Sequence, residues 1–232
     1  MDKIQTILTA MRADMIPAQE RGRWSVSKGE ITIERAESFK RLALAKKCPA
    51  VDAGHYTWLH CLTLATMHRP PGETVMNDFG HELRKHLEFI LLARGRVLVT
   101  GLGLGCVVRG LLAHGMVEHI DLVERSEDVI AMCAASVADP RVTLHHRDAL
   151  AGAMEGEWDF AWHDLFNEPE RGDKALQVMH AQLISMYFDQ VPRQGAWAMP
   201  RRHFKGLLKS GRDVWRAKNR PRKREGTLES HR

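Results

Sequence analysis

Three closely spaced glycines, Gly101, Gly103 and Gly105, are the residues that point most directly to ligand binding. They follow a short apolar run at residues 97–99 and precede residues 106–114, whose apolar spacing predicts a helix. A strand that ends in glycines and opens a helix lets the backbone approach a ligand where a Cβ atom would clash, and it aims the helix N-terminus at that ligand. The glycines alone are a weak signal, but in this context they predict a nucleotide-binding bend.

Acidic residues follow the next two predicted strands. Glu124 ends the strand at residues 119–124, where a carboxylate can accept hydrogen bonds from both hydroxyls of a ribose. Asp148 follows the strand at residues 142–145 and can reach an adenine amino group, while the small Ala149 leaves room for the ring. Asp148 could equally be the N-cap of the short helix that follows it. With the glycine bend, these residues predict a site for an adenosyl ligand.

A fourth predicted strand, residues 158–163, delivers His163 and Asp164 at its carboxyl end, the edge where open α/β sheets hold ligands. Asp164 is the main catalytic candidate, because its carboxylate could deprotonate a nucleophile or hold it beside an electrophilic carbon. His163 is the weaker candidate, since successive side chains of a strand point to opposite faces. The pair His145-His146 lacks a third ligand, so no metal site is expected.

The spacing of the bend excludes two other nucleotide sites. A dinucleotide fingerprint requires Gly-x-Gly-x-x-Gly, whereas the glycines here alternate with single residues. A Walker loop requires Gly-Lys followed by Ser or Thr, which the bend lacks. An adenosyl compound, S-adenosylmethionine above all, is therefore the predicted cofactor.

The elements around these residues alternate between strand and helix. Strands are predicted at 97–99, 119–124, 142–145, 158–163 and 195–199, and helices at 78–94, 106–114, 128–137, 149–154 and 173–190. This alternation predicts an α/β fold with a doubly wound, mostly parallel, Rossmann-like sheet. The stretch between Asp164 and the C-terminal tail is too short for the usual last two or three strands of such a sheet, so a truncated C-terminal half is expected.

The first third of the chain has a different pattern. Residues 2–21 read as an amphipathic helix, residues 24–26 and 31–33 as strands around a turn at Lys28-Gly29, and residues 55–67 as β-rich. Residues 36–47 fit a helix or a strand. We therefore expect an N-terminal helix with a small β-rich subdomain over 1–76, a nucleotide-binding domain over 77–200, and a basic C-terminal tail over 201–232.

With these residues in place, the chain resembles the class I S-adenosylmethionine-dependent methyltransferase superfamily, and within it the spermidine synthase branch, over roughly residues 54–165. The segments similar to motifs of that branch are His81-Glu82-Leu83-Arg84-Lys85-His86, Leu122-Val123-Glu124, Asp139-Pro140-Arg141-Val142 and Arg147-Asp148-Ala149. The resemblance implies that the nucleoside pocket is lined by Gly101, Gly103, Gly105, Glu124, Asp148 and Ala149, with His81 as a further cofactor-binding residue. It also implies that Asp164 activates an amine nucleophile. The phrase Trp162-His163-Asp164 is similar to one in short spermidine-synthase-like proteins of bacteriophages.

Three functions follow as alternatives. The first is methyl transfer from S-adenosylmethionine to an acceptor that the sequence does not name. The second is aminopropyl transfer from decarboxylated S-adenosylmethionine to a polyamine. The synthases place an acid in their glycine loop to hold the aminopropyl ammonium, and Leu104 at that place argues against this function. The third is a non-catalytic binding protein of the same fold that acts on a partner or on nucleic acid.

The composition separates the body from the tail. The chain has 232 residues and a net charge of +5, of which residues 201–224 carry +10 and residues 1–200 carry −4. Phe204 and Trp215 interrupt the basic segment, which could bind nucleic acid or be a solvated terminus. No apolar run is long enough for a membrane span, and no secretory signal is evident, so a cytoplasmic protein that does not enter a membrane is expected. A homo-oligomer is compatible with these features.

Overall fold

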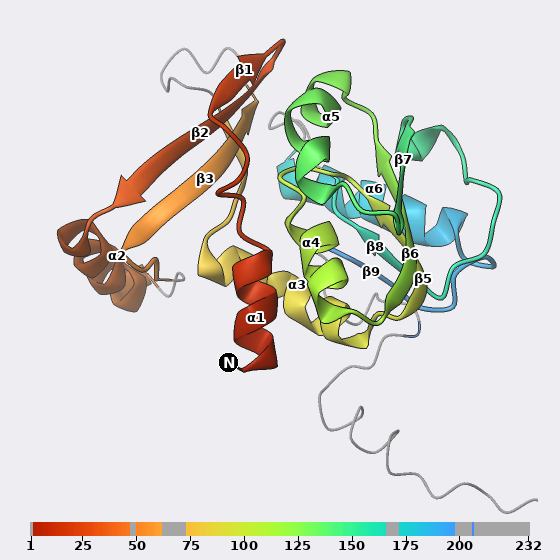
Figure 1. The fold of residues 1–232 in the computed structure, drawn as a ribbon, viewed down its shortest axis with the longest axis horizontal. Helices are drawn as coiled ribbons and strands as arrows, with labels where there is room; N and C mark the ends of the chain where they lie inside the picture. The colour runs from red at the N-terminus through yellow and green to blue at the C-terminus, as the bar shows by residue number, and fades with distance from the viewer. Residues whose placement is uncertain (1, 47–49, 62–72, 166–171, 198–205, 207–232) are drawn as a thin grey trace, which may run out of the picture.

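The computed structural model describes residues 2–46, 50–61, 73–165, 172–197 and 206. They form an antiparallel sheet with one helix beside it and a parallel sheet flanked by helices, with α1 and α3 between the two (Figure 1). Within this described part, no helix has the length and apolar character needed to cross a membrane.

The larger sheet contains five parallel strands. These are β5 (Gly95–Thr100), β6 (Val117–Glu124), β7 (Val142–His146), β8 (Phe160–His163) and β9 (Gln194–Ala196), in the spatial order β7-β6-β5-β8-β9. The chain therefore starts in the centre, moves to one edge, and then crosses back beyond β5. This order, with its reversal between β5 and β8, is that of a doubly wound Rossmann-like sheet, as the sequence predicts.

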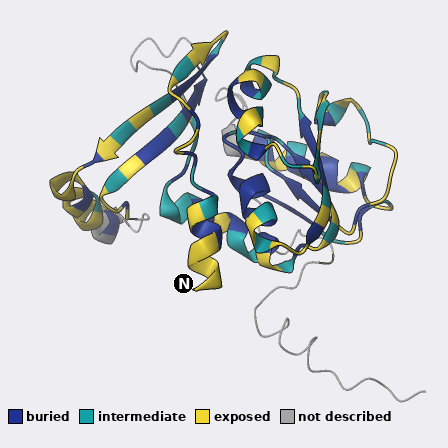
Figure 2. Ribbon diagram, viewed as in Figure 1, coloured by how far each residue is buried: buried dark blue, intermediate teal, exposed yellow. Residues whose placement is uncertain are grey.

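Helices cover both faces of the parallel sheet. One face carries α3 (Gly80–Leu92), α4 (Cys106–His114) and α5 (Glu127–Cys133), and the other carries α6 (Gly172–Met186). In β5, Val97 and Val99 pack on the first face and Leu98 on the second, all fully buried. Burial on both faces explains why the strand is a continuous apolar run rather than an alternating one. In Figure 2 this sheet is mostly dark blue.

The smaller sheet is antiparallel, in the order β1 (Gln19–Arg21), β2 (Trp24–Ile31), β3 (Gly54–Cys61) and β4 (Glu73–Asn77). Helix α2 (Ile33–Lys46) lies beside its outer end (Figure 1). Trp24, Leu59 and Cys61 belong to the same core cluster as Val97. The two sheets therefore share one hydrophobic core.

Three predictions for the N-terminal part are wrong, one of them the strand at 31–33, because β2 ends at Ile31 and α2 begins at Ile33. The predicted helix over 2–21 is only α1 (Lys3–Ala10), and Gln19–Arg21 pairs with β2 as a strand. The predicted turn at Lys28-Gly29 is absent, because β2 pairs with β3 along its whole length. Gly29 instead makes room for the Trp58 ring, which would lie 3.2 Å from a Cβ atom at that position. Residues 36–47, for which the sequence left helix and strand open, fall largely within α2.

The remaining element boundaries differ by a few residues. The helix predicted at 149–154 is a single 3-10 turn, η2 (Ala149–Ala151), and that at 128–137 is α5 followed by a second 3-10 turn, η1 (Ala134–Val137). The predicted strand and loop features at 62–72, the last residues of the predicted fifth strand, and the basic tail lie outside the described residues.

Helix α1 packs on the larger domain rather than on the small sheet. A Cβ atom on Gly110 of α4 would lie 2.7 Å from Ile90 of α3 and 2.9 Å from Met11, directly after α1. Three helices therefore approach closely at Gly110. The predicted segment 1–76 is thus divided in the fold. Helix α1 packs on α3 and α4, whereas β1–β4 form the small sheet.

Candidate active site

A cavity of about 390 Å³ opens at the carboxyl edge of the parallel sheet. Its walls come from the segments after β5, β6, β7 and β8, from β4 of the small sheet, and from α3 and α6. The polar and glycine residues that line it are Thr74, Asn77, Glu82, His86, Gly101, Gly103, Glu124, Arg125, Arg147, Asp148 and Asp164. The cavity lies beside the reversal between β5 and β8, which is where open α/β sheets hold ligands.

Two of the three predicted glycines line this cavity. Gly101 has φ +97°, and a Cβ atom there would lie 2.1 Å from the backbone oxygen of Asp164. Gly103 has φ +49°, and its Cβ atom would lie 2.7 Å from Met76 Sδ. Gly105 is the N-cap of α4 and faces Val137 rather than the cavity. The bend therefore combines two glycines at the ligand side with one that turns the chain into the helix.

Glu124 is held at the glycine bend by two backbone groups. The N–H of Leu102 donates to Glu124 Oε2 at 2.9 Å, and the N–H of Ser126 donates to Oε1 at 2.8 Å. Each carboxylate oxygen keeps a second lone pair, and the side chain lines the cavity. The two backbone bonds fix the carboxylate where ribose hydroxyls could donate to it.

Asp148 and Ala149 line the cavity beside Glu124. Asp148 is also the N-cap of η2, because Oδ1 accepts from the N–H of Leu150 at 2.9 Å. The two roles proposed for it from the sequence are therefore compatible. Arg125 and Arg147 line the same end of the cavity, so that end carries two cationic groups which the sequence did not single out.

Asp164 faces the cavity from the end of β8. Its N–H donates to the carbonyl of Thr100 at 2.8 Å, and its side chain keeps 19% of its surface exposed. Burial and, to a smaller extent, the Glu82 carboxylate raise the pKa of Asp164 to about 7, with Lys85 partly offsetting them. A carboxyl with such a pKa can exchange a proton with a substrate near neutral pH.

His163 faces the opposite side of the sheet. It is fully buried and does not line the cavity. Its Nδ1 is 3.1 Å from Thr100 Oγ1, its Nε2 is 3.1 Å from Gln194 Oε1, and its ring stacks on Tyr187. Burial lowers its pKa to about 4, so the ring is neutral. The structure thus places His163 where it can fix the end of β8, out of reach of a ligand in the cavity.

In the run at residues 81–86, Glu82 and His86 line the cavity, and the predicted residue His81 does not. Glu82 and His86, one helical turn apart on α3, line the cavity, whereas His81 lies beside Phe79 and 3.2 Å from Glu82. His86 is 97% buried, its Nε2 is 4.0 Å from Asp164 Oδ2, and burial lowers its pKa to about 4. The i, i+4 spacing of Glu82 and His86 was the signal that could have found both.

Leu104 lies in the hydrophobic core and does not line the cavity. Its side chain therefore does not decide whether a cationic ligand is accepted. The carboxylates of Glu82 and Asp164 face the cavity instead, from α3 and β8. The expectation that Leu104 disfavours aminopropyl transfer required its side chain to face the ligand, and the structure places it in the core instead.

Arg109, on α4, connects the glycine bend to α1 and η1 through hydrogen bonds. The buried guanidinium donates to the carbonyls of Ala10, Met11 and Leu104 and to Ser136 Oγ, at 2.8–3.2 Å. These acceptors belong to the end of α1, to the glycine bend and to η1. One side chain thus links three segments that are far apart in the sequence, and it does so without touching the cavity.

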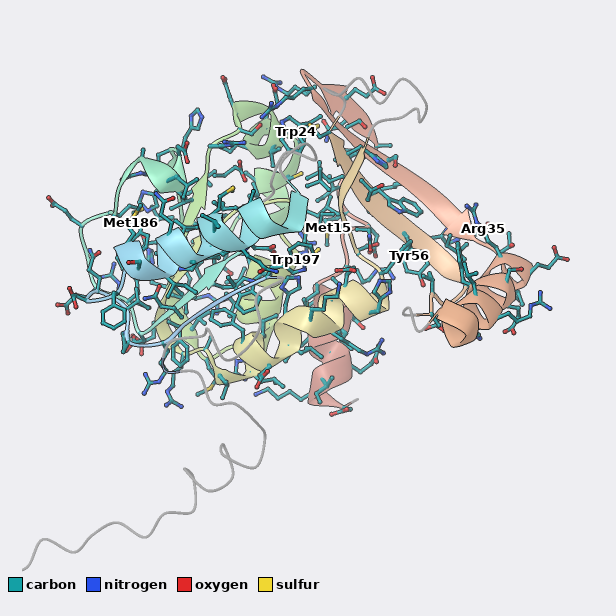
Figure 3. All side chains as sticks on the ribbon, turned by 180° about the vertical axis from the view of Figure 1, so that it is seen from behind. Met15, Trp24, Arg35, Tyr56, Met186 and Trp197 are labelled. Carbon is teal, nitrogen blue, oxygen red and sulfur yellow. The ribbon has the colours of Figure 1, made fainter. Side chains whose placement is uncertain are left out.

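The rest of the cavity wall is apolar, and the small sheet contributes part of it. Trp24, Leu59, Val75 and Met76 line it, and Met76 Sδ accepts from the N–H of Leu104 at 3.3 Å. Trp197, after β9, lines it from the other side and is seen between α6 and α3 in the rear view of Figure 3. No group of three or more His, Cys, Asp or Glu is arranged to hold a metal ion in the described part of the chain.

Comparison with curated proteins gives one match to part of the sequence. A polyamine aminopropyltransferase from Lachnoclostridium phytofermentans is 32% identical over 78 residues, which cover 30% of this chain and 28% of that protein. The similarity is confined to that stretch, and the chain spans little more than a quarter of the aminopropyltransferase. No family model matches it.

The chain also resembles solved structures over part of its length. The spermidine synthase from Thermotoga maritima matches with a TM-score of 0.46 and 16% identity, over 78% of this chain and 56% of that one. An S-adenosylmethionine-dependent methyltransferase from Mesorhizobium loti matches with a TM-score of 0.35 and 19% identity, over 47% of this chain and 49% of that one. These two neighbours are a spermidine synthase and a methyltransferase, and the chain spans about half the length of each.

Proposed function

We propose that this protein is a transferase that uses an adenosyl sulfonium donor to alkylate a nucleophile, most simply by methyl transfer from S-adenosylmethionine. The observation that carries the proposal is the common cavity of Gly101, Glu124 and Asp164, which joins a nucleoside cradle to a group that can exchange protons. The residues fit an adenosyl group, because Gly101, Gly103 and the small Ala149 line the cavity beside the carboxylates of Glu124 and Asp148. The likeness to known transferases of this donor class supports the same proposal.

In this proposal Glu124 accepts hydrogen bonds from the ribose hydroxyls, and Asp148 accepts one from the adenine amino group. The donor, when bound, supplies a carbon that the positive sulfur has already activated. Asp164 holds the nucleophile beside that carbon and takes its proton, for which a pKa of about 7 is suited. Alignment of the two reactants accounts for most of the acceleration, since little other chemistry is required of the chain.

The neutral state of His86 supports an acceptor that arrives with a positive charge. Glu82 and Asp164 are the acidic groups on the α3 side of the cavity; Lys85 pairs with Glu82, and the neutral His86 leaves Asp164 without a cation beside it. A cationic acceptor would gain from this field, whereas an anionic one would be repelled. An amine, protonated in solution and deprotonated by Asp164 at the site, is therefore the acceptor class we favour.

A second candidate, aminopropyl transfer from decarboxylated S-adenosylmethionine, is favoured by one observation. Among the described residues that line the cavity, Arg125 and Arg147 are the cationic ones, and both flank the proposed adenosine-binding residues. Lys85, at the rim on the α3 side, is already paired with Glu82, so among the described residues the carboxylate of S-adenosylmethionine would have no cationic partner of its own there. The decarboxylated donor does not require one.

Calorimetry with both donors tests the proposal and separates the two candidates. We expect both to bind through their shared adenosyl group, and tighter binding of the decarboxylated form would favour aminopropyl transfer. Transfer would then be measured by mass spectrometry of a primary amine incubated with each donor. An absence of binding by both donors would refute the proposal, and binding without transfer to any amine would leave a non-catalytic adenosyl-binding protein.

A further inference from the structure

Lys85 lies at the rim of the candidate active site, on the α3 side. Its Nζ donates to both carboxylate oxygens of Glu82, at 2.7 and 2.8 Å, and lies 5.6 Å from the centre of the Trp197 ring. Glu82 and Trp197 both line the cavity. The Lys85 ammonium group is therefore held by two residues of the cavity wall, Glu82 and Trp197.

A carboxylate next to an aromatic face is a favourable place for an ammonium ion. The carboxylate forms charge-assisted hydrogen bonds, and the ring attracts the cation through its electron-rich face. In this protein that place is taken by Lys85. A ligand ammonium could enter it only by displacing the lysine, since two cations in one place repel each other.

The charges on this side of the cavity then leave room for one ligand cation. Glu82 is paired with Lys85, and His81 lies 3.2 Å from the same carboxylate. Asp164 has no cationic partner within 4 Å among the described residues except His86, at 4.0 Å, whose pKa of about 4 leaves it neutral. A single carboxylate therefore remains to balance an acceptor's charge.

We propose that Lys85 is a specificity-determining residue that occupies the place of a second ammonium group, so that the acceptor is an amine with one positive charge rather than a diamine or longer polyamine. The inference rests on the proposed function and deepens it. The acceptor's ammonium gives one proton to the Asp164 carboxylate, and its nitrogen lone pair forms a bond to the donor carbon. The carbon–sulfur bond breaks with its electron pair going to sulfur, which leaves a neutral thioether and an alkylated ammonium product.

The test compares butylamine with 1,4-diaminobutane, which have the same chain length and differ in one amine. In the intact protein with either donor, we expect a kcat/KM for butylamine about 10-fold or more above that for the diamine. Lys85→Met removes the charge but keeps the chain length, and it should reduce this preference by about 10-fold, because Glu82 and Trp197 become available to the second ammonium. Lys85 is 46% exposed on its side chain, so the melting temperature should stay unchanged.

Lys40→Met is the matched control. Lys40 pairs with Glu37 on α2 at 3.0 Å, with the same i, i+3 spacing and the same 46% exposure, but away from the cavity. It should leave the amine preference as it is in the unmodified chain. The same ratio in Lys85→Met as in Lys40→Met would overturn the inference.

A binding measurement gives a readout that is independent of turnover. Calorimetry of each amine in the presence of methylthioadenosine, which fills the nucleoside end, should show the same switch in preference. If methylthioadenosine binds and Lys85→Met leaves the ratio of amine affinities unchanged, the inference about Lys85 fails and the proposed function stands. If no adenosyl compound binds, the proposed function fails first.

Discussion

The backbone N–H of Leu102 donates to the carboxylate of Glu124 at 2.9 Å, across 22 residues of sequence. This bond joins the glycine bend after β5 to the acid at the end of β6. It means that the two parts of the proposed nucleoside site are positioned by each other before any ligand arrives. Such pre-organisation lowers the cost of ordering the site on binding.

Asp164→Asn tests the proposed proton acceptor. The amide keeps the shape of the side chain but cannot take a proton, so donor binding should be unchanged while turnover falls by about 10²- to 10⁴-fold. In the unmodified protein, turnover should rise with pH through about 7, because burial, then Glu82, raises the Asp164 pKa and a base must be ionised to act. Steady-state rates between pH 5.5 and 8.5 check both points. Asp189→Asn, at an exposed position after α6, is the control, and equal turnover in the two variants would remove Asp164 from the mechanism.

Gly101→Ala tests the close approach of the bend to β8. The new Cβ atom would lie 2.1 Å from the backbone oxygen of Asp164, where no flexible side chain can yield, and φ of +97° adds backbone strain. We expect a loss of about 3 kcal/mol or more of unfolding free energy, measured by urea denaturation. Gly115→Ala has a similar φ of +75° but nothing within 4 Å, so it should cost only about 1 kcal/mol. Equal losses would mean that the contact with Asp164 is unimportant.

Arg109→Lys tests the link between α1 and the bend. Lysine keeps the charge, but it cannot reproduce a planar guanidinium that serves four acceptors in three segments. Buried carbonyls left without a donor should lower the unfolding free energy by about 3 kcal/mol and weaken adenosyl binding several-fold. The control is Arg96→Lys, since Arg96 is half exposed and pairs with Asp121 at 3.3 Å. Unchanged stability and affinity in Arg109→Lys would show that the link is dispensable.

Truncation after residue 200 tests the basic segment at 201–224. We propose from its charge of +10 and its two aromatic residues that it binds nucleic acid through phosphates. Binding to a fluorescent duplex and to single-stranded DNA should fall steeply with added salt and be lost in the truncated chain. Adenosyl binding should be the same in both. Salt-independent binding, or binding that persists after truncation, would refute this role.

The sequence predicts the glycine bend and Glu124 well, because both depend on local spacing along consecutive strands. Gly101 needs a positive φ, and the strand before it and the helix after it are readable from apolar periodicity. The parallel sheet follows from the strand–helix alternation and the right-handed crossover rule. These features require no knowledge of distant contacts.

The walls of the cavity were less predictable. Met76, Trp24 and Trp197 reach it from elements whose relative placement depends on the shared core of the two sheets. The sequence predicts a turn at Gly29 because a glycine that accommodates the Trp58 ring has the same local signature. The His-Glu run predicts a ligand contact for His81, but the helical register turns Glu82 and His86 toward the cavity instead.

The most direct test of the account is calorimetry of the intact chain with S-adenosylmethionine, decarboxylated S-adenosylmethionine and methylthioadenosine, repeated with Glu124→Ala. Glu118→Ala, an exposed position on the same strand, is the control. We predict that adenosyl compounds bind to the unmodified chain and to the control, and that Glu124→Ala weakens binding by about 10- to 100-fold through loss of the ribose acceptor. No binding at millimolar concentration, or equal binding by Glu124→Ala, would contradict the claim that this bend and this carboxylate hold an adenosyl group.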